Sequence, residues 1–75
     1  MNAEKTSVTV VIPVYNEKDN IPELLERTLK ACRALGRAGR SWELILVDDG
    51  SRDGSSEMLA EAARNNPGEI KALLL

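Results

Sequence analysis

Apolar residues in this chain gather in short continuous runs, separated by stretches in which they recur at helical spacing. Two runs, residues 8–12 and 42–47, are nearly all apolar and rich in β-branched residues and leucine, which predicts strands buried on both faces. A third run occupies residues 69–75. Between the runs, residues 21–35 place one apolar stripe along a helix, and residues 55–64 form a second helix with a thinner apolar side. The pattern therefore predicts the order β-α-β-α-β.

Residues that favour the ends of strands and helices stand at the borders of these runs. Pro13 cannot donate a hydrogen bond to a strand ladder, so we expect it to end the first strand. Asn20 stands where it can cap the first helix, and Glu23 completes the spacing of a capping box. Gly36 marks the end of that helix, and Asp53 is placed to cap the second one.

The predicted elements fit the start of a Rossmann-like α/β fold. Crossovers of helix length join parallel strands and are nearly always right-handed, so we expect a parallel sheet of the doubly wound kind. A chain of 75 residues allows one small domain, residues 1–75, in which we expect residues 1–7 to be disordered. Residues 72–75 form an apolar run without a turn residue or a cap. We therefore expect the N-terminal piece of a longer domain, truncated in or just after the third strand.

Composition excludes several classes of function. The chain has no histidine, which rules out a Ser-His-Asp triad and a His-ligated zinc, and its single cysteine, Cys32, permits no internal disulfide. Aromatic residues make up 3% and the net charge is −2, so we expect no nucleic-acid partner, which would need stacking surfaces and positive charge. No apolar run approaches the ~20 residues of a membrane helix.

Polar residues follow the first and second strands, where ligands bind in open parallel sheets. The residues that the two loops place there are Pro13, Tyr15, Asn16 and Glu17 from the first loop and Asp48, Asp49, Gly50, Ser51 and Asp53 from the second. Asp53 and Asn20 are explained as well by capping roles. Asp48 and Asp49 are adjacent acids that repel each other at the end of an apolar strand, and this cost favours a functional role.

Two segments in these loops resemble motifs of a known enzyme family. Residues 11–17, Val-Ile-Pro-Val-Tyr-Asn-Glu, and residues 46–55, Leu-Val-Asp-Asp-Gly-Ser-Arg-Asp-Gly-Ser, are similar at this separation to the motifs of inverting family 2 glycosyltransferases of GT-A fold. The openings of the first helix (21–24) and of the second strand (42–45) look closest to the polyprenyl-phosphate glycosyltransferases. The likeness covers residues 8–75.

The resemblance implies a role for each loop residue. Pro13, Tyr15 and Glu17 match positions that line the nucleotide pocket in the family. Asp49 matches the acid that accepts a hydrogen bond from a ring N–H of the base, and Asp48 matches its neighbour in the pocket, which shapes the loop. Uracil and guanine both offer such an N–H, so this acid does not choose between UDP- and GDP-sugars. The supporting loop residues are Asn16, Gly50, Ser51 and Asp53.

The resemblance also implies what lies outside this chain. The family holds a divalent metal, Mg²⁺ or Mn²⁺, through a D-x-D motif, and no aspartates here have that spacing. The acid that deprotonates the acceptor also follows the third strand in the family. We therefore expect no catalytic residue, no metal ligand and no turnover in these 75 residues. The full enzyme would move a sugar from a nucleotide diphosphate to a polyprenyl (lipid) phosphate at the cytoplasmic face of the inner membrane.

Two other interpretations account for part of the pattern. Residues 44–49 resemble the start of a phospho-signalling receiver domain, in which paired acids bind magnesium, but this leaves residues 8–40 unexplained. An interaction module without a ligand would need neither acid. Truncation itself has a further consequence: a sheet of three parallel strands that lacks its other strands leaves an apolar edge and one face uncovered, so we expect self-association.

Overall fold

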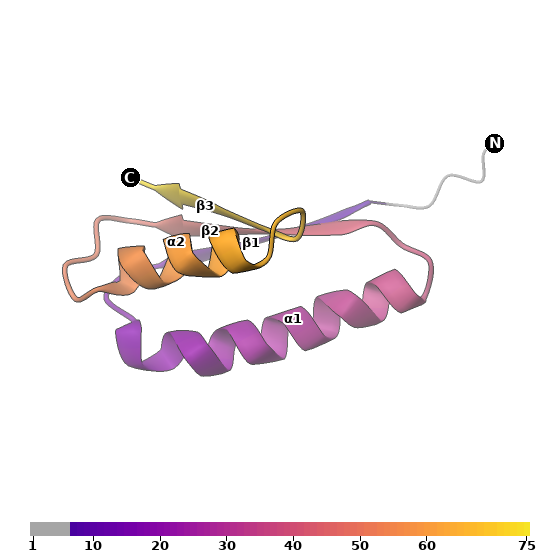
Figure 1. Ribbon diagram of the computed structural model, residues 1–75, viewed down its shortest axis with the longest axis horizontal. Helices are drawn as coiled ribbons and strands as arrows, with labels where there is room; N and C mark the ends of the chain where they lie inside the picture. Colours follow the sequence, from indigo (N-terminus) through magenta and orange to yellow (C-terminus); the bar gives the residue numbers. More distant parts are fainter. Residues whose placement is uncertain (1–6) are drawn as a thin grey trace.

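The computed structural model describes residues 7–75 and has the predicted β-α-β-α-β order (Figure 1). A short 3-10 helix, η1, precedes the first α-helix. The elements are β1 (Val8–Val14), η1 (Lys18–Asn20), α1 (Ile21–Arg37), β2 (Trp42–Asp48), α2 (Ser55–Asn65) and β3 (Ile70–Leu74). The N-terminal segment that we expected to be disordered lies outside the described residues except for Ser7, which is exposed.

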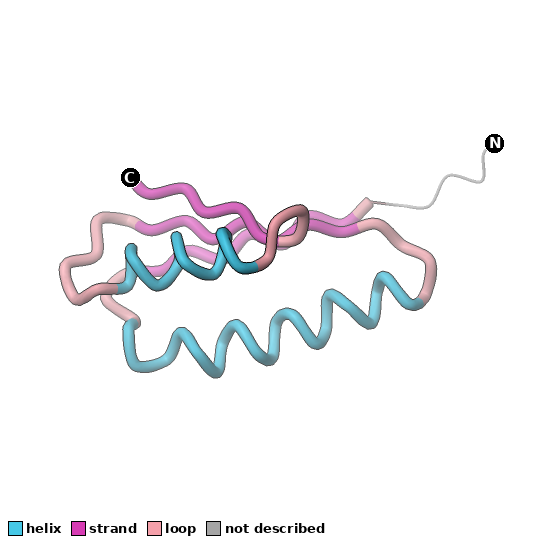
Figure 2. Tube along the Cα trace, viewed as in Figure 1, coloured by secondary structure: helices cyan, strands magenta, loops and turns pink. Residues whose placement is uncertain are grey.

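The three strands form one parallel sheet in the order β1-β2-β3. The register pairs Val14 of β1 with Asp48 of β2, and Asp48 in turn with Leu74 of β3, so the carboxyl ends of all three strands meet at one edge. The expected parallel α/β sheet is confirmed. Both helices lie on the same side of this sheet (Figure 2).

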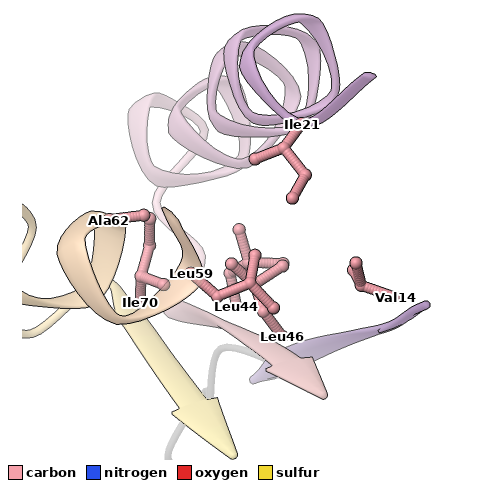
Figure 3. Close-up of a cluster of buried hydrophobic side chains, with 7 residues drawn as sticks. All are labelled: Val14, Ile21, Leu44, Leu46, Leu59, Ala62 and Ile70. Atoms are coloured by element: carbon pink, nitrogen blue, oxygen red, sulfur yellow. The ribbon is translucent and has the colours of Figure 1, made fainter. Parts of the chain in front are cut away.

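The core lies between the helices and the even-numbered positions of the strands. Leu44 and Leu46 of β2 are fully buried, and Figure 3 shows Ile21 of α1 and Leu59 of α2 pointing toward them. Burying a side chain of this size stabilises the fold by about 1.5–3 kcal/mol. Ala62 is small, which lets α2 approach the sheet closely.

No described element covers the opposite face of the sheet. Val11 and Leu73 are 56% and 52% exposed, whereas Val10, Ile12 and Ala72 on the other face are partly buried. The prediction that the strands are buried on both faces is therefore wrong for residues 7–75. The cause is topological: strands placed in chain order, joined by crossovers of one hand, put both helices on one face.

One predicted strand end and one predicted cap also differ from the structure. β1 continues through Pro13 to Val14, because β1 is an edge strand here and a proline that lacks an N–H is tolerated at an edge. Asn20 occupies the N-cap position of α1, but its side chain makes no capping hydrogen bond. Its Nδ2 instead donates to Glu17 Oε2 at 2.9 Å, so the predicted capping box does not form.

Neither helix within residues 7–75 has the length and apolar character required to cross a bilayer.

Candidate functional site

The loops that follow β1 and β2 leave the sheet side by side at its carboxyl edge (Figure 1). The backbone N of Asp49 donates to the carbonyl oxygen of Val14 at 3.0 Å, one residue beyond the paired strands. Tyr15 and Asp49, the residues that follow Val14 and Asp48, therefore begin neighbouring segments. The topology brings together the two loops in which the sequence predicted site residues.

Asn16 joins the first loop to the second. Its backbone N donates to Ser51 Oγ at 2.8 Å, and its side-chain Oδ1 accepts from the backbone N of Arg52 at 2.9 Å. Asn16 has a φ of 49°, in the left-handed region that asparagine tolerates better than most residues. The two hydrogen bonds hold this unusual backbone conformation in place.

Asp53 and Ser55 make a second connection, which we call the clasp. Ser55 Oγ accepts from the backbone N of Glu17 at 3.0 Å, and Asp53 Oδ2 accepts from the backbone N of Lys18 at 3.1 Å. Asp53 Oδ1 in turn accepts from Ser55 Oγ at 2.6 Å and from Ser55 N at 3.0 Å. The hydrogen bond from Ser55 lowers the pKa of the Asp53 carboxyl. The two loops are thus joined by hydrogen bonds at Asn16, Glu17 and Lys18.

The clasp also corrects the predicted cap of α2. The N-cap residue is Gly54, with a φ of 97°, and not Asp53. Asp53 still accepts the free N–H of Ser55 in the first turn, but from one position further out. A left-handed residue at the cap was not predicted, because the preference of aspartate for caps is stronger in general than that of glycine.

Asp48 is buried beneath the second loop, with 1% of its surface exposed. Its Oδ2 accepts three hydrogen bonds, from Gly50 N at 3.1 Å, Ser51 N at 2.9 Å and Ser56 Oγ at 2.9 Å. Burial opposes the charge of this carboxylate, but the hydrogen bonds from Ser51, Ser56 and Gly50 outweigh it and lower the pKa. Its Oδ1 is buried and has no partner among the described residues. The geometry makes Asp48 a residue that shapes the loop.

Six of the predicted residues are exposed at this edge: Pro13, Tyr15, Asn16, Glu17, Asp49 and Gly50. Tyr15 exposes 57% of its surface. Within residues 7–75 the Asp49 carboxylate makes no hydrogen bond or ion pair, whereas Glu17 receives a hydrogen bond from Asn20. The exposed carboxylate of Asp49 can accept an N–H, and the exposed ring of Tyr15 can cover a flat ring; both residues directly follow the paired ends of β2 and β1.

Sequence reasoning missed Ser55 and Ser56 as residues of this site. Ser55 is fully buried in the clasp, and Ser56 donates to Asp48. Two serines directly after a glycine at the start of a helix were the available signal, because hydroxyls there can bond with loop groups as well as with the helix. Lys18 and Arg52 take part only through their backbone N–H groups.

The acidic residues of this edge do not make a metal site. Within the described part of the chain, no three His, Cys, Asp or Glu side chains come together in a way that could hold a metal ion. Asp48 Oδ2 already accepts three hydrogen bonds, and both carboxylate oxygens of Asp53 already accept hydrogen bonds within the clasp. These residues therefore do not fit the divalent metal that the family resemblance implies.

A hollow of about 280 Å³ lies at the opposite edge of the sheet, around the amino ends of β1 and β2. Its lining residues are Ser7, Val8, Thr9, Ser41, Trp42 and Glu43. The hollow contains none of the predicted residues, and ligands of parallel sheets bind at the carboxyl edge. We therefore place the candidate site at the carboxyl edge.

Comparison with known proteins agrees with the motifs. The family model described as "Glycosyl transferase family 2" matches residues 9–73. The chain is 56% identical over 69 residues to the undecaprenyl-phosphate 4-deoxy-4-formamido-L-arabinose transferase of Pectobacterium atrosepticum, covering 92% of the chain and 20% of the relative. It is 48% identical over 68 residues to the protein of the same name from Salmonella newport, again covering 20% of the relative.

The chain thus spans about a fifth of the length of the curated relatives that it matches. These relatives belong to the polyprenyl-phosphate group that the sequence resembles, so the expected subgroup is confirmed. Because the family model covers nearly every described residue, including both loops of the site, the chain belongs to glycosyl transferase family 2.

Proposed function

We propose that this chain is the nucleotide-binding half of an inverting glycosyltransferase, which transfers a sugar from a UDP- or GDP-sugar to a polyprenyl phosphate. The observation that carries the proposal is that two loops at the carboxyl edge are held together by hydrogen bonds. The hydrogen bonds between the loops fix the backbone of both, while Tyr15 and Asp49, which follow the paired ends of β1 and β2, remain exposed. Membership of the family makes a sugar nucleotide the expected ligand of this edge.

The proposed contacts follow from the chemistry of the exposed groups. The Asp49 carboxylate accepts the imide N–H of uracil or the ring N–H of guanine, a charge-assisted hydrogen bond that contributes about 1.5–3 kcal/mol. Tyr15 offers a flat face or a hydroxyl beside the base. Pro13 and Glu17 line the same edge, while Asp48 acts from below by holding the loop.

The remaining parts of the reaction lie outside these residues in our proposal. The relatives are named for transfer to undecaprenyl phosphate, which makes a lipid phosphate the proposed acceptor, at the cytoplasmic face of the inner membrane. A divalent metal, Mg²⁺ or Mn²⁺, would be held by acidic residues that this chain does not contain. The 75-residue chain alone should show no sugar transfer, and robust metal-dependent transfer by it would contradict this division.

Calorimetric titration of the chain with UDP and GDP tests the proposal. We expect both to bind, and Asp49→Asn to weaken binding by about tenfold, because the acceptor loses its charge. Asp19→Asn is the matched control, since it removes the same charge from an exposed residue of η1. The proposal fails if neither nucleotide binds, or if the two variants behave alike.

The same titration separates the other interpretations. A receiver domain would bind Mg²⁺ without a nucleotide. The Asp48 carboxylate is poorly placed to bind Mg²⁺, because its Oδ2 already accepts three hydrogen bonds. An interaction module without a ligand would respond to neither Mg²⁺ nor nucleotide, and Asp49→Asn would change nothing.

A further inference from the structure

The start of α2 carries a buried hydroxyl that the proposed nucleotide contacts do not use. Ser55 is fully buried, and its Oγ donates to Asp53 Oδ1 at 2.6 Å. The same oxygen accepts from the backbone N of Glu17 at 3.0 Å. The hydroxyl therefore lies between the loops: its proton goes to the second loop, and its lone pair takes an amide of the first.

We propose that Ser55 is a positioning residue of the nucleotide site, which acts by fixing the backbone of residues 15–17 relative to Asp49. The inference rests on the proposed function, because it assigns a task to Ser55 only if these residues bind a nucleotide. Ser55 itself touches no ligand in this proposal, since it has no exposed surface.

The exposure of the first loop explains why positioning is needed. Tyr15 is 57% exposed and Glu17 is exposed, so packing against the core does not fix either residue. Their placement depends on the backbone, which is bonded at Asn16, Glu17 and Lys18 to the second loop. A loop held in its binding conformation loses less entropy when a ligand binds, so the clasp contributes to affinity without contact.

Serine has the chemistry that this position requires. A group there must donate to the Asp53 carboxylate and accept from the Glu17 amide, within a space that has no exposed surface. Alanine would leave the Glu17 amide without its acceptor, whereas threonine keeps the hydroxyl. The comparison of these two residues therefore separates the hydroxyl from the rest of the side chain.

The experiment measures UDP and GDP affinity of the 75-residue chain and of Ser55→Ala, Ser55→Thr and Ser41→Ala. Ser41 is an exposed serine at the opposite edge, where its Oγ bonds to that of Ser7, so it controls for loss of a serine hydroxyl. We expect Ser55→Ala to weaken binding on the order of tenfold, Ser55→Thr to recover most of it, and Ser41→Ala to change it less than twofold. Amide hydrogen exchange should show faster exchange at Glu17 in Ser55→Ala alone.

Each outcome has a separate meaning. If the parent chain binds neither nucleotide, the proposed function fails and the role of Ser55 fails with it. If the parent chain binds but Ser55→Ala binds equally well, only the role of Ser55 is overturned, even if the Glu17 amide exchanges faster. If Ser55→Ala does not fold, Asp53→Asn takes its place, because it weakens the same clasp from the other side, and unchanged affinity in that variant overturns the proposal.

Discussion

Asp48 and Asp49 show how neighbouring acids come to lie in opposite environments, one buried and one exposed. Side chains alternate between the two faces of a strand, so Asp48 shares the covered face with Leu44 and Leu46, and Asp49 follows on the exposed loop. The residue pattern alone predicts only that the pair is functional, and the division of tasks between Asp48 and Asp49 came from the family resemblance. That division depends on which face the helices cover, and the helices approach from the side of Asp48.

Asp48 should make the stability of the fold depend on pH. Its pKa is lowered on folding, so its contribution to stability is present above the unfolded pKa of about 3.9 and is lost as the pH falls through the lower folded value. We expect Asp48→Asn to reduce the free energy of unfolding by about 1–3 kcal/mol at pH 7, because three donors lose a charged acceptor.

Urea unfolding of the parent chain and of Asp48→Asn between pH 7 and pH 2 checks this expectation. The difference between them should shrink below about pH 4, as the carboxyl is protonated first in the unfolded state and, at lower pH, in the folded state. Asp19→Asn, an exposed substitution, should change little at any pH. A difference between the parent chain and Asp48→Asn that stays constant over this range would show that the charge of Asp48 is not what stabilises the loop.

At the scale of elements, hydrophobic spacing was a reliable guide and local end signals were weaker. The apolar runs and the helical spacing predicted each strand and α-helix of the described chain, whereas η1 falls in a stretch expected to be a loop. The cap of α2 was assigned to Asp53, yet the chain uses Gly54 in a left-handed conformation. Asp53 is instead drawn toward Lys18 by a contact between residues 35 apart, which no local pattern encodes.

Gly54 should therefore resist substitution. Gly54→Ala forces a side chain into a φ of 97°, which costs about 1–2 kcal/mol, whereas Gly54→Asn should cost less because asparagine tolerates this region. A built Cβ would meet Lys18 Cδ at 3.7 Å, an ordinary contact, so the cost comes from the backbone. Thermal unfolding of both variants measures it, and equal stability of Gly54→Ala and the parent chain would refute the assignment.

At the scale of the whole molecule, the parallel sheet, its edge and an uncovered face were predicted from the sequence, but which face the helices cover was not. The spacing of elements indicates crossovers of helix length, and these favour a parallel sheet with both loops at one edge. Which face a helix covers depends on strand order, and apolar runs carry no information about order. The strands β1-β2-β3 follow the chain, which leaves Val11 and Leu73 on an uncovered face.

The uncovered face leads us to expect self-association of the 75-residue chain. Sedimentation velocity at increasing concentration should show larger species, because exposed apolar surface of this kind drives association. Leu73→Lys places a charge on the uncovered face and should shift the chain toward monomer. Ala31→Lys places the same charge on the exposed side of α1 and should not. A compact monomer at all concentrations would contradict the expectation.

The location of nucleotide binding is the most direct test of the account. In a titration of the ¹⁵N-labelled chain with UDP or GDP, we predict that amide signals of Tyr15–Glu17 and Asp49–Ser51 shift. Signals of the opposite edge, Ser7–Thr9 and Ser41–Glu43, should stay in place. Signals of Tyr15 and Asp49 that remain unchanged at saturating nucleotide would contradict the central claim, that the paired loops at the carboxyl edge form a nucleotide site.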